Sequence, residues 1–357
     1  MSIYVIIAIA AFGFLIAVHE VGHFSAAKLL GVKVNEFAIG MGPKLFGKQG
    51  KETLYTIRAF PFGGFCAMES QDEAADDPRA FTSQKRWRRF VILFAGSAAN
   101  FIVAFVFILI LNAGITGLAG TTIMDIVDGF PNQGEQGLMV GDTIVSINGE
   151  RLYYVEDFST FMQLSSSSQV DLVVRRDGAT ISLNRFPLER RTYVINGESV
   201  LRYGLTFNAI KASPLENLKY SAYQAMHFVR LIRISLARLV SGAVGLREMS
   251  GPVGIVDAMN DIGQAAAAEF GFMAALRNIV YLTAFIGVNL AVMNMLPIPA
   301  LDGGRILFIF ITLVIEKIMR RRLDPKYEGY IHTGAMVLLI GFMVFILISD
   351  VMKLFNA

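Results

Sequence analysis

The sequence predicts a polytopic α-helical membrane protein with a β-rich loop against the membrane and an inserted soluble domain of helices and strands. The 357 residues are 54% hydrophobic and 17% charged, with a mean hydropathy of +0.53, which is too apolar for an ordinary soluble enzyme. Four apolar stretches are each about as long as the ~20 residues that cross a bilayer. Between the second and third stretches, the sequence changes to short alternating strands, turns and ordinary charge density.

The apolar stretches predict four membrane-spanning helices. They cover residues 1–18, 90–117, 278–301 and 333–349. We expect the helices at about 1–24, 90–117, 278–304 and 333–352, which divides the membrane part into a first half (1–118) and a second half (271–357). A cleaved signal peptide is the alternative for the first stretch, but the chain starts without the positively charged region that such a signal needs.

Lysine and arginine in short loops predict the orientation of the spans. Residues 25–89 contain 11 Lys/Arg and residues 306–331 contain five, whereas the residues before His19 contain none. We therefore expect both basic loops in the cytoplasm and both termini outside, together with the long segment between the second and third spans. The basic run KRWRRF at 85–90 is interpreted as an interface anchor of the second span and not as a nucleic-acid site.

The first span ends in His19-Glu20-Val21-Gly22-His23, which matches the H-E-x-x-H signature of zinc hydrolases. Positions four apart lie on one face of a helix, so His19 and His23 can bind one ion while Glu20 lies beside them. The alternative is an ordinary hydrogen-bonded polar pair. Because ionisable residues inside apolar spans are rare and functional by default, we interpret the pair as metal ligands.

Two histidines and a water leave tetrahedral zinc one protein ligand short. Asp302 is the only carboxylate in the third apolar stretch, FIGVNLAVMNMLPIPALDGGRILF, and it lies at the depth of the histidines if both spans enter from the same side. Pro297 and Pro299 predict a kink or an unwound backbone before it. Asn289 and Asn294 could donate hydrogen bonds to a substrate carbonyl or oxyanion, with helix packing through amides as the alternative.

The loop after the first span, residues 33–70, predicts short strands because apolar and polar residues partly alternate between Gly and Pro breaks. A protease must hold its substrate extended, often at a sheet edge. The alternative is a cytoplasmic loop that lies against the lipid headgroups. Cys66, the single cysteine, cannot form an internal disulfide and is expected to be a buried or inert thiol.

Residues 119–211 predict a small soluble domain, with hairpin turns at Asn148-Gly149 and Asp177-Gly178. The segment LMVGDTIVSINGERL resembles the signature of PDZ domains, which bind a peptide by adding it to a sheet edge. By this resemblance Gly204-Leu205 belongs to the carboxylate loop.

Residues 212–270 are expected to form an amphipathic helix and a linker. Ser213-Pro214-Leu215-Glu216 has the form of a capping box at the helix start. The helix is expected to rest on the membrane or on its own domain, with His227 as an ordinary surface residue, and SGPVGIV at 250–256 breaks it. His332, at the start of the fourth span, is interpreted as an interfacial residue.

Taken together, HEVGH, FAIGMGPKLF with AFPFGGF, the PDZ-like insertion, SGPVGIV and NMLPIPALDGG resemble the bacterial site-2 proteases, a family of zinc-dependent intramembrane endopeptidases. The resemblance implies that His19, His23 and Asp302 bind Zn²⁺ and that Glu20 is the catalytic base. One departure is Ser97 in AGSAAN, where the family commonly has proline.

The resemblance also implies the substrate and the location. The substrate is the membrane helix of a single-span protein, such as an anti-sigma factor or a signal-peptide remnant, shortened by an earlier cut outside the membrane. The enzyme lies in the bacterial inner membrane, with the PDZ domain as a size filter or dock and no nucleic-acid partner. Two alternatives from other classes are a membrane metal transporter and a non-catalytic membrane adaptor that acts through the PDZ domain.

Overall fold

The computed structural model describes residues 2–69, 77–165, 167–195, 198–243, 245, 251–320 and 325–356. The chain forms two compact units: a membrane unit, Met1–Leu111 with Gln224–Ala357, and an inserted unit, Asn112–Tyr223. Four helices in the described residues are long and apolar enough to cross a membrane: Ile3–Leu29, Arg86–Asn112, Phe272–Asn294 and Gly329–Ile348. The prediction of four helices with the length and apolar composition of membrane spans is therefore confirmed.

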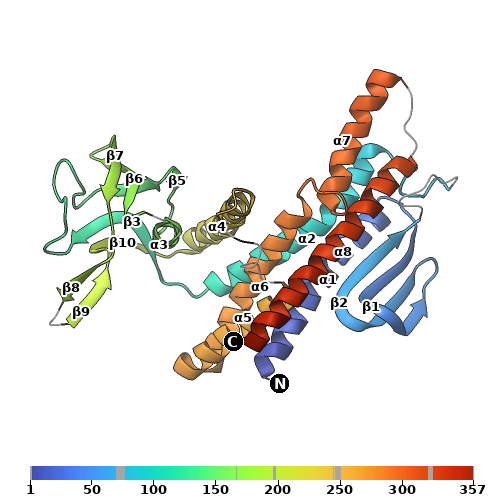
Figure 1. Ribbon diagram of the computed structural model, residues 1–357, viewed down its shortest axis with the longest axis horizontal. Coiled ribbons are helices and arrows are strands. Elements are labelled where there is room, and N and C mark those ends of the chain that lie inside the picture. Colours follow the sequence, from blue (N-terminus) through green and yellow to red (C-terminus); the bar gives the residue numbers. More distant parts are fainter. Residues whose placement is uncertain are drawn as a thin grey trace. The chain divides into compact units, whose positions relative to one another are not determined.

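The membrane unit contains most of the helices, and in Figure 1 α1 begins and α8 ends at the same end of this unit. Large apolar side chains such as Phe14, Ile102 and Leu338 are exposed along these helices, as expected for surfaces that contact lipid. The helices with residues in this unit are α1 Ile3–Leu29, α2 Arg86–Asn112, α4 Pro214–Val240, α5 Pro252–Phe270, α6 Phe272–Asn294, α7 Asp302–Met319 and α8 Pro325–Asn356.

The amphipathic pattern of α4 is used for packing between helices. Ser213 Oγ accepts a hydrogen bond from Glu216 N at 3.2 Å, as the capping box predicts. Further along α4, Phe228 and Ile232 are buried in a cluster with residues of α2 and α6. The apolar side of this part of α4 therefore lies against two membrane helices. After α4 the motif SGPVGIV begins a new helix, because α5 has Gly251 as its N-cap and Pro252 in its first turn.

The predicted β-rich loop is a hairpin of β1 Val34–Gln49 and β2 Leu54–Met68. Bulges fold it over, so that Phe37 pairs with both Tyr55 and Cys66. The first half of β1 therefore lies between the two halves of β2. The second half of β2, residues 64–68, forms one edge of the sheet and is its outer half. Glycines at positive φ, such as Gly40 at 88° and Gly63 at 90°, allow the bends.

The third span differs from its prediction, because the expected helix over residues 278–304 is not continuous. α6 ends at Asn294, and Asp302 begins the separate helix α7. Pro297 and Pro299 lie between them, in the position where the sequence predicted a kink or an unwound backbone. The carboxylate of Asp302 is thereby placed in the first turn of a helix, after a seven-residue loop, Met295–Leu301.

The inserted unit is built on a sheet with the strand order β10-β3-β4-β6-β7, in which β5 pairs with β4. The predicted turns are present: φ is 49° and 82° at Asn148 and Gly149, and 48° and 83° at Asp177 and Gly178, as type I′ turns require. The sequence did not predict helix α3 Val155–Leu164 or the hairpin of β8 Arg191–Ile195 and β9 Glu198–Arg202. The sheet strands are β3 Gly117–Ile126, β4 Thr143–Ile147, β5 Glu150–Arg151, β6 Gln169–Arg176, β7 Ala179–Pro187 and β10 Leu205–Lys211.

The Gly141-Asp142 turn of the inserted unit is held by a buried ion pair. Asp142 is fully buried, and its two carboxylate oxygens accept hydrogen bonds from Arg176 Nε and Nη2, both at 2.8 Å. The same guanidinium also donates to the carbonyls of Glu135 and Gly137. One arginine of β6 therefore ties the loop before β4 to the sheet.

Replacing Arg176 by methionine is expected to destabilise the inserted unit by about 3–5 kcal/mol, because the carboxylate of Asp142 stays buried without its cation. Limited proteolysis of the full chain over a urea series, with cleavage within residues 112–223 as the readout, measures this loss. The exposed neighbour Arg175 is the control, and Arg175→Met should change stability by less than about 0.5 kcal/mol. Equal effects of the two substitutions would show that the ion pair between Arg176 and Asp142 does not stabilise the inserted unit.

Candidate metal centre

Three candidate ligands from distant parts of the sequence meet in the membrane unit. His19 and His23 lie one turn apart on α1, with their Nε2 atoms 3.1 Å apart. Asp302 Oδ2 lies 3.2 Å from Nε2 of each. The three ligand atoms all lie within 4.8 Å of one another, and this is the one such cluster of His, Cys, Asp or Glu in the described part of the chain. The ligand set predicted from the sequence is therefore brought together by the fold.

The orientation of His23 is fixed by the backbone of α2. Its Nδ1 lies 2.8 Å from the carbonyl oxygen of Ile92, which can only accept, so Nδ1 carries the hydrogen. The Nε2 lone pair consequently points at Asp302. A ligating histidine commonly donates its other N–H to a carbonyl in this way, which sets both the tautomer and the ring orientation.

The donor set fits a divalent cation. An imidazole lone pair and a carboxylate oxygen at hydrogen-bonding distance repel each other unless a proton or a cation lies between them. Two nitrogens and one oxygen are also the kind of three-ligand set that hydrolytic zinc sites use, with the fourth position left for water or substrate. His19, His23 and Asp302 would hold such an ion.

A close approach of α1 and α2 places the histidines. A Cβ on Gly96 of α2 would lie 2.4 Å from His23 Nε2 and 2.8 Å from His19 Cε1. A Cβ on Gly22 of α1 would lie 2.4 Å from the carbonyl oxygen of Ala95. Only glycine fits at either position, so the two helices meet through a pair of glycines directly at the metal ligands.

The loop before Asp302 is folded tightly over the start of α7. A Cβ on Gly303 would lie 2.3 Å from the carbonyl of Met295, and a Cβ on Gly304 would lie 2.2 Å from the carbonyl oxygen of Ile298. The two glycines after Asp302 are thus required by the contact between the loop and the helix. This packing fixes the position from which the carboxylate reaches the histidines.

A cavity of about 270 Å³ opens beside the three ligands. Glu20 accepts a hydrogen bond from the backbone of Cys66 on the outer half of β2. Burial raises the pKa of the Cys66 thiol to about 12, and this residue is not part of the cluster formed by His19, His23 and Asp302. The cavity is lined by His19, Glu20, His23, Phe65, Cys66, Met68, Leu93, Asn294, Ala300, Leu301 and Asp302.

Of the two candidate asparagines, Asn294 lines the cavity and Asn289 does not. The Nδ2 of Asn294 lies 3.4 Å from His19 Nδ1. Asn289 lies away from the cavity because five residues along a helix correspond to a different face. The amide of Asn294 is therefore the one that lies beside the metal ligands.

The remaining residues singled out in the sequence also have defined positions. Ser97 is buried within α2, which continues through the position where the family commonly has proline. His227 is half-buried on α4. His332, interpreted from the sequence as an interfacial residue without a matching partner, does have one: its side chain is buried, and its Nδ1 accepts a hydrogen bond from Ala300 N. Sequence patterns gave no signal for the roles of Gly96, the Ile92 carbonyl or His332.

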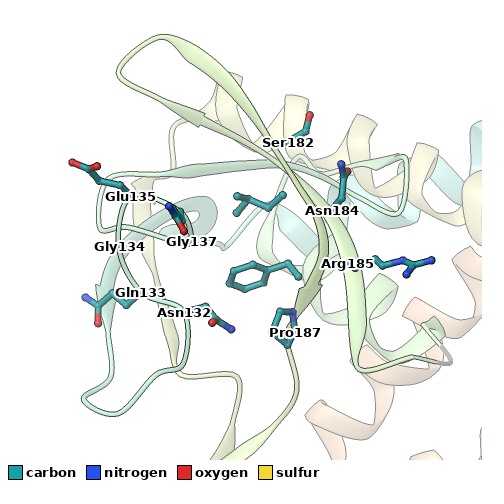
Figure 2. Close-up of a pocket in the computed structure, with 12 residues that line it drawn as sticks. Asn132, Gln133, Gly134, Glu135, Gly137, Ser182, Asn184, Arg185 and Pro187 are labelled. Carbon is teal, nitrogen blue, oxygen red and sulfur yellow. The ribbon is translucent and has the colours of Figure 1, made fainter.

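A second, larger cavity of about 690 Å³ lies in the inserted unit, between the loop of residues 132–137 and strand β7. Figure 2 shows that the charged side chains at its wall, Glu135 and Arg185, point away from the space between loop and strand. This cavity therefore lacks converging ionisable groups, and it is not a candidate for the chemistry of the metal centre.

Comparisons with known proteins identify zinc metalloproteases among the relatives of this chain. Residues 7–342 match the family model described as Peptidase family M50. A "Putative zinc metalloprotease" of Clostridium acetobutylicum is 37% identical over 353 residues, which cover 99% of this chain and 98% of that protein. The "Regulator of sigma-W protease RasP" of Bacillus subtilis is 28% identical over 434 residues, covering 98% of this chain and 99% of that protein. The cofactor of this chain is therefore Zn²⁺.

Replacing Gly96 by alanine is expected to weaken zinc binding by at least about tenfold, because the added methyl group displaces both histidine rings. Chelator competition on the purified full chain measures the affinity. The control is Gly341→Ala on α8, where a Cβ would meet nothing within 4 Å. Wild-type zinc affinity in the Gly96→Ala variant would show that the helix contact does not position the ligands.

Proposed function

The chain belongs to peptidase family M50, the site-2 protease family, and we propose that this zinc metallopeptidase is an intramembrane endopeptidase that cleaves the membrane helices of single-span proteins. One observation carries the proposal. Two of the three proposed zinc ligands and Glu20 are side chains of α1, a helix long and apolar enough to cross a bilayer. A peptide bond that reaches these groups must itself enter the membrane region.

Glu20 is the proposed general base. It lines the ligand cavity together with His19, His23 and Asp302, and its carboxylate is held by the backbone of Cys66. The chemistry that zinc supplies when bound is Lewis acidity, which activates water and polarises a peptide carbonyl. Glu20 accepts the proton of the attacking water and delivers it to the leaving nitrogen. Asn294 is the proposed hydrogen-bond donor to the oxyanion, since its amide lies at the cavity.

The outer half of β2 is the proposed platform for the substrate. It forms one edge of the curled hairpin sheet, and three of its residues, Phe65, Cys66 and Met68, line the cavity. A Cβ on Gly64 would lie 3.3 Å from Glu20 Cγ, so this strand runs directly past the base. An unwound substrate that pairs with the edge would present its carbonyls beside Glu20.

The inserted unit is the proposed dock or size filter, with a PDZ-like role. β10 is an edge strand of the sheet, and it follows Gly204, which has a positive φ of 77°. Phe158 of α3 lies against this strand, with its ring centroid 5.1 Å from that of Phe207. A strand edge flanked by a helix is the arrangement that PDZ domains use to bind a peptide end.

The orientation follows from the number of spans and the charge distribution. With four spans, both termini and the segment between the second and third spans lie on the same side. The 11 Lys/Arg of residues 25–89 favour the cytoplasm for the other side. We therefore propose a bacterial inner membrane protein with extracytoplasmic termini. The name of the Bacillus subtilis relative mentions sigma-W, which favours membrane-anchored regulators such as anti-sigma factors, already cut outside the membrane, as substrates.

The Glu20→Gln variant is expected to keep its zinc and to cleave a membrane substrate at least about 100-fold more slowly, because a general base contributes roughly 10²–10⁴ in rate. Zinc content and single-turnover cleavage are measured on the same sample. Glu269→Gln, at an exposed position of α5, is the matched control. Undiminished cleavage by the zinc-loaded Glu20→Gln variant would show that Glu20 is not the general base. A variant without proteolysis that still moves zinc across vesicles would favour a transporter.

Substrate helices that unwind more easily should be cleaved faster, since a fully hydrogen-bonded helix hides its carbonyls from attack. Replacing one alanine near the cleaved bond by glycine lowers helix stability by about 1 kcal/mol, which corresponds to an increase of about fivefold in kcat/KM. Matched substrate pairs that differ only at this position provide the measurement. Equal rates for both members would mean that local unwinding does not limit cleavage.

A further inference from the structure

The loop between α6 and α7 has one backbone donor whose partner lies on another helix. Pro297 and Pro299 have no N–H group. The N–H groups of the other residues, apart from Ala300, donate to carbonyls of α6 or of the loop itself: Met295 to Val292, Leu296 to Met293, Ile298 to Leu296 and Leu301 to Ile298. The N–H of Ala300 instead crosses to the fourth membrane span.

The acceptor is His332 of α8. Its Nδ1 lies 3.0 Å from Ala300 N, and the side chain is only 4% exposed. Because a backbone N–H can only donate, this nitrogen is unprotonated, and the ring hydrogen of the neutral imidazole is on Nε2. The ring also packs against Phe308 of α7, with their centroids 5.1 Å apart. The imidazole thus contacts both the loop and the helix that carries Asp302.

Ala300 has a backbone conformation that needs such support. Its φ is +82°, in the left-handed region that residues with a Cβ rarely adopt, at a cost of order 1–3 kcal/mol. It lies two residues before Asp302 and lines the zinc cavity. A change in this peptide would redirect Leu301 and with it the start of α7. The direction of the Asp302 carboxylate therefore depends on how the Ala300 peptide is held.

We propose that His332 is a positioning residue of the zinc centre: its Nδ1 holds the Ala300 peptide in the conformation that directs Asp302 toward His19 and His23. The fourth membrane span is thereby connected to the metal site, although none of its described side chains lines the cavity. The requirement is specific, since the position needs a hydrogen-bond acceptor one bond beyond Cγ. Asparagine offers an oxygen at that distance, whereas glutamine offers one a bond further out and leucine offers none.

The test compares His332→Asn, His332→Gln and His332→Leu in the full chain, purified in detergent. Thr333→Val, on an exposed neighbour in α8, is the control. Four quantities are measured: the visible absorption spectrum of the Co²⁺-substituted protein, the Kd for zinc by chelator competition, and kcat and KM on a membrane substrate. Cobalt absorption reports the geometry of the ligands without requiring turnover.

We expect His332→Leu and His332→Gln to alter the cobalt spectrum, to weaken zinc binding by about 10–100-fold and to lower kcat with little change in KM. His332→Asn should recover the wild-type spectrum, and its zinc affinity and kcat should lie within a few-fold of wild type. The Asn and Gln variants are both polar and similar in size, so their difference tests the proposal even if the leucine variant does not fold.

Wild-type cobalt spectra and zinc affinities in the Leu and Gln variants would overturn the proposal. Equal losses of zinc affinity in the His332→Asn and His332→Gln variants would also overturn it, because they would mean that the imidazole acts through its size and not through Nδ1. These outcomes are independent of the substrate, and they differ from a failure of the proposed proteolysis, in which zinc and cobalt binding stay intact while no membrane substrate is cut.

Discussion

The close approach of the Asp302 carboxylate to the imidazoles of His19 and His23 is the constraint on which the site of the membrane unit depends. An anionic carboxylate at the level of membrane-spanning helices is costly unless a cation compensates for the lost water. The two imidazole nitrogens and the carboxylate oxygen lie within 4.8 Å of one another, so one zinc ion bound by all three would compensate for the charge of the carboxylate. Such an ion would serve folding as well as chemistry, since it would join α1 to the start of α7.

The glycines around the centre allow Asp302, His19 and His23 to meet, and a strand lies beside Glu20. Gly22 and Gly96 let α1 and α2 approach closely enough to orient the rings, and Gly303 and Gly304 let the preceding loop fold over α7. The outer half of β2 brings backbone hydrogen-bonding groups to Glu20, where a strand can be added. The glycines are therefore placed where a Cβ would separate the elements that the site must bring together.

Much of this arrangement could be predicted from the sequence, because it is expressed in local patterns. Apolar length gives the spans, and the four-residue spacing of His19 and His23 places both on one helix face. The rest depends on contacts that have no local pattern. The carbonyl of Ile92 is a group that every residue carries, so its bond to His23 leaves no mark in the sequence. The start of a separate helix at Asp302 depends on how the proline-containing loop folds, which the sequence pattern does not show. His332 and its partner Ala300 are 32 residues apart in the sequence and meet only in the folded chain.

X-ray absorption at the zinc edge, on the full chain and on its Asp302→Asn variant, tests whether Asp302 and the two histidines share one ion. We expect nitrogen and oxygen ligands at about 2.0–2.2 Å and no sulfur at about 2.3 Å in the unmodified chain. We also expect the Asp302→Asn variant to lose most of its zinc or to change its ligand shell. A sulfur ligand from Cys66, or an unchanged spectrum and full zinc content in the Asp302→Asn variant, would contradict a shared ion.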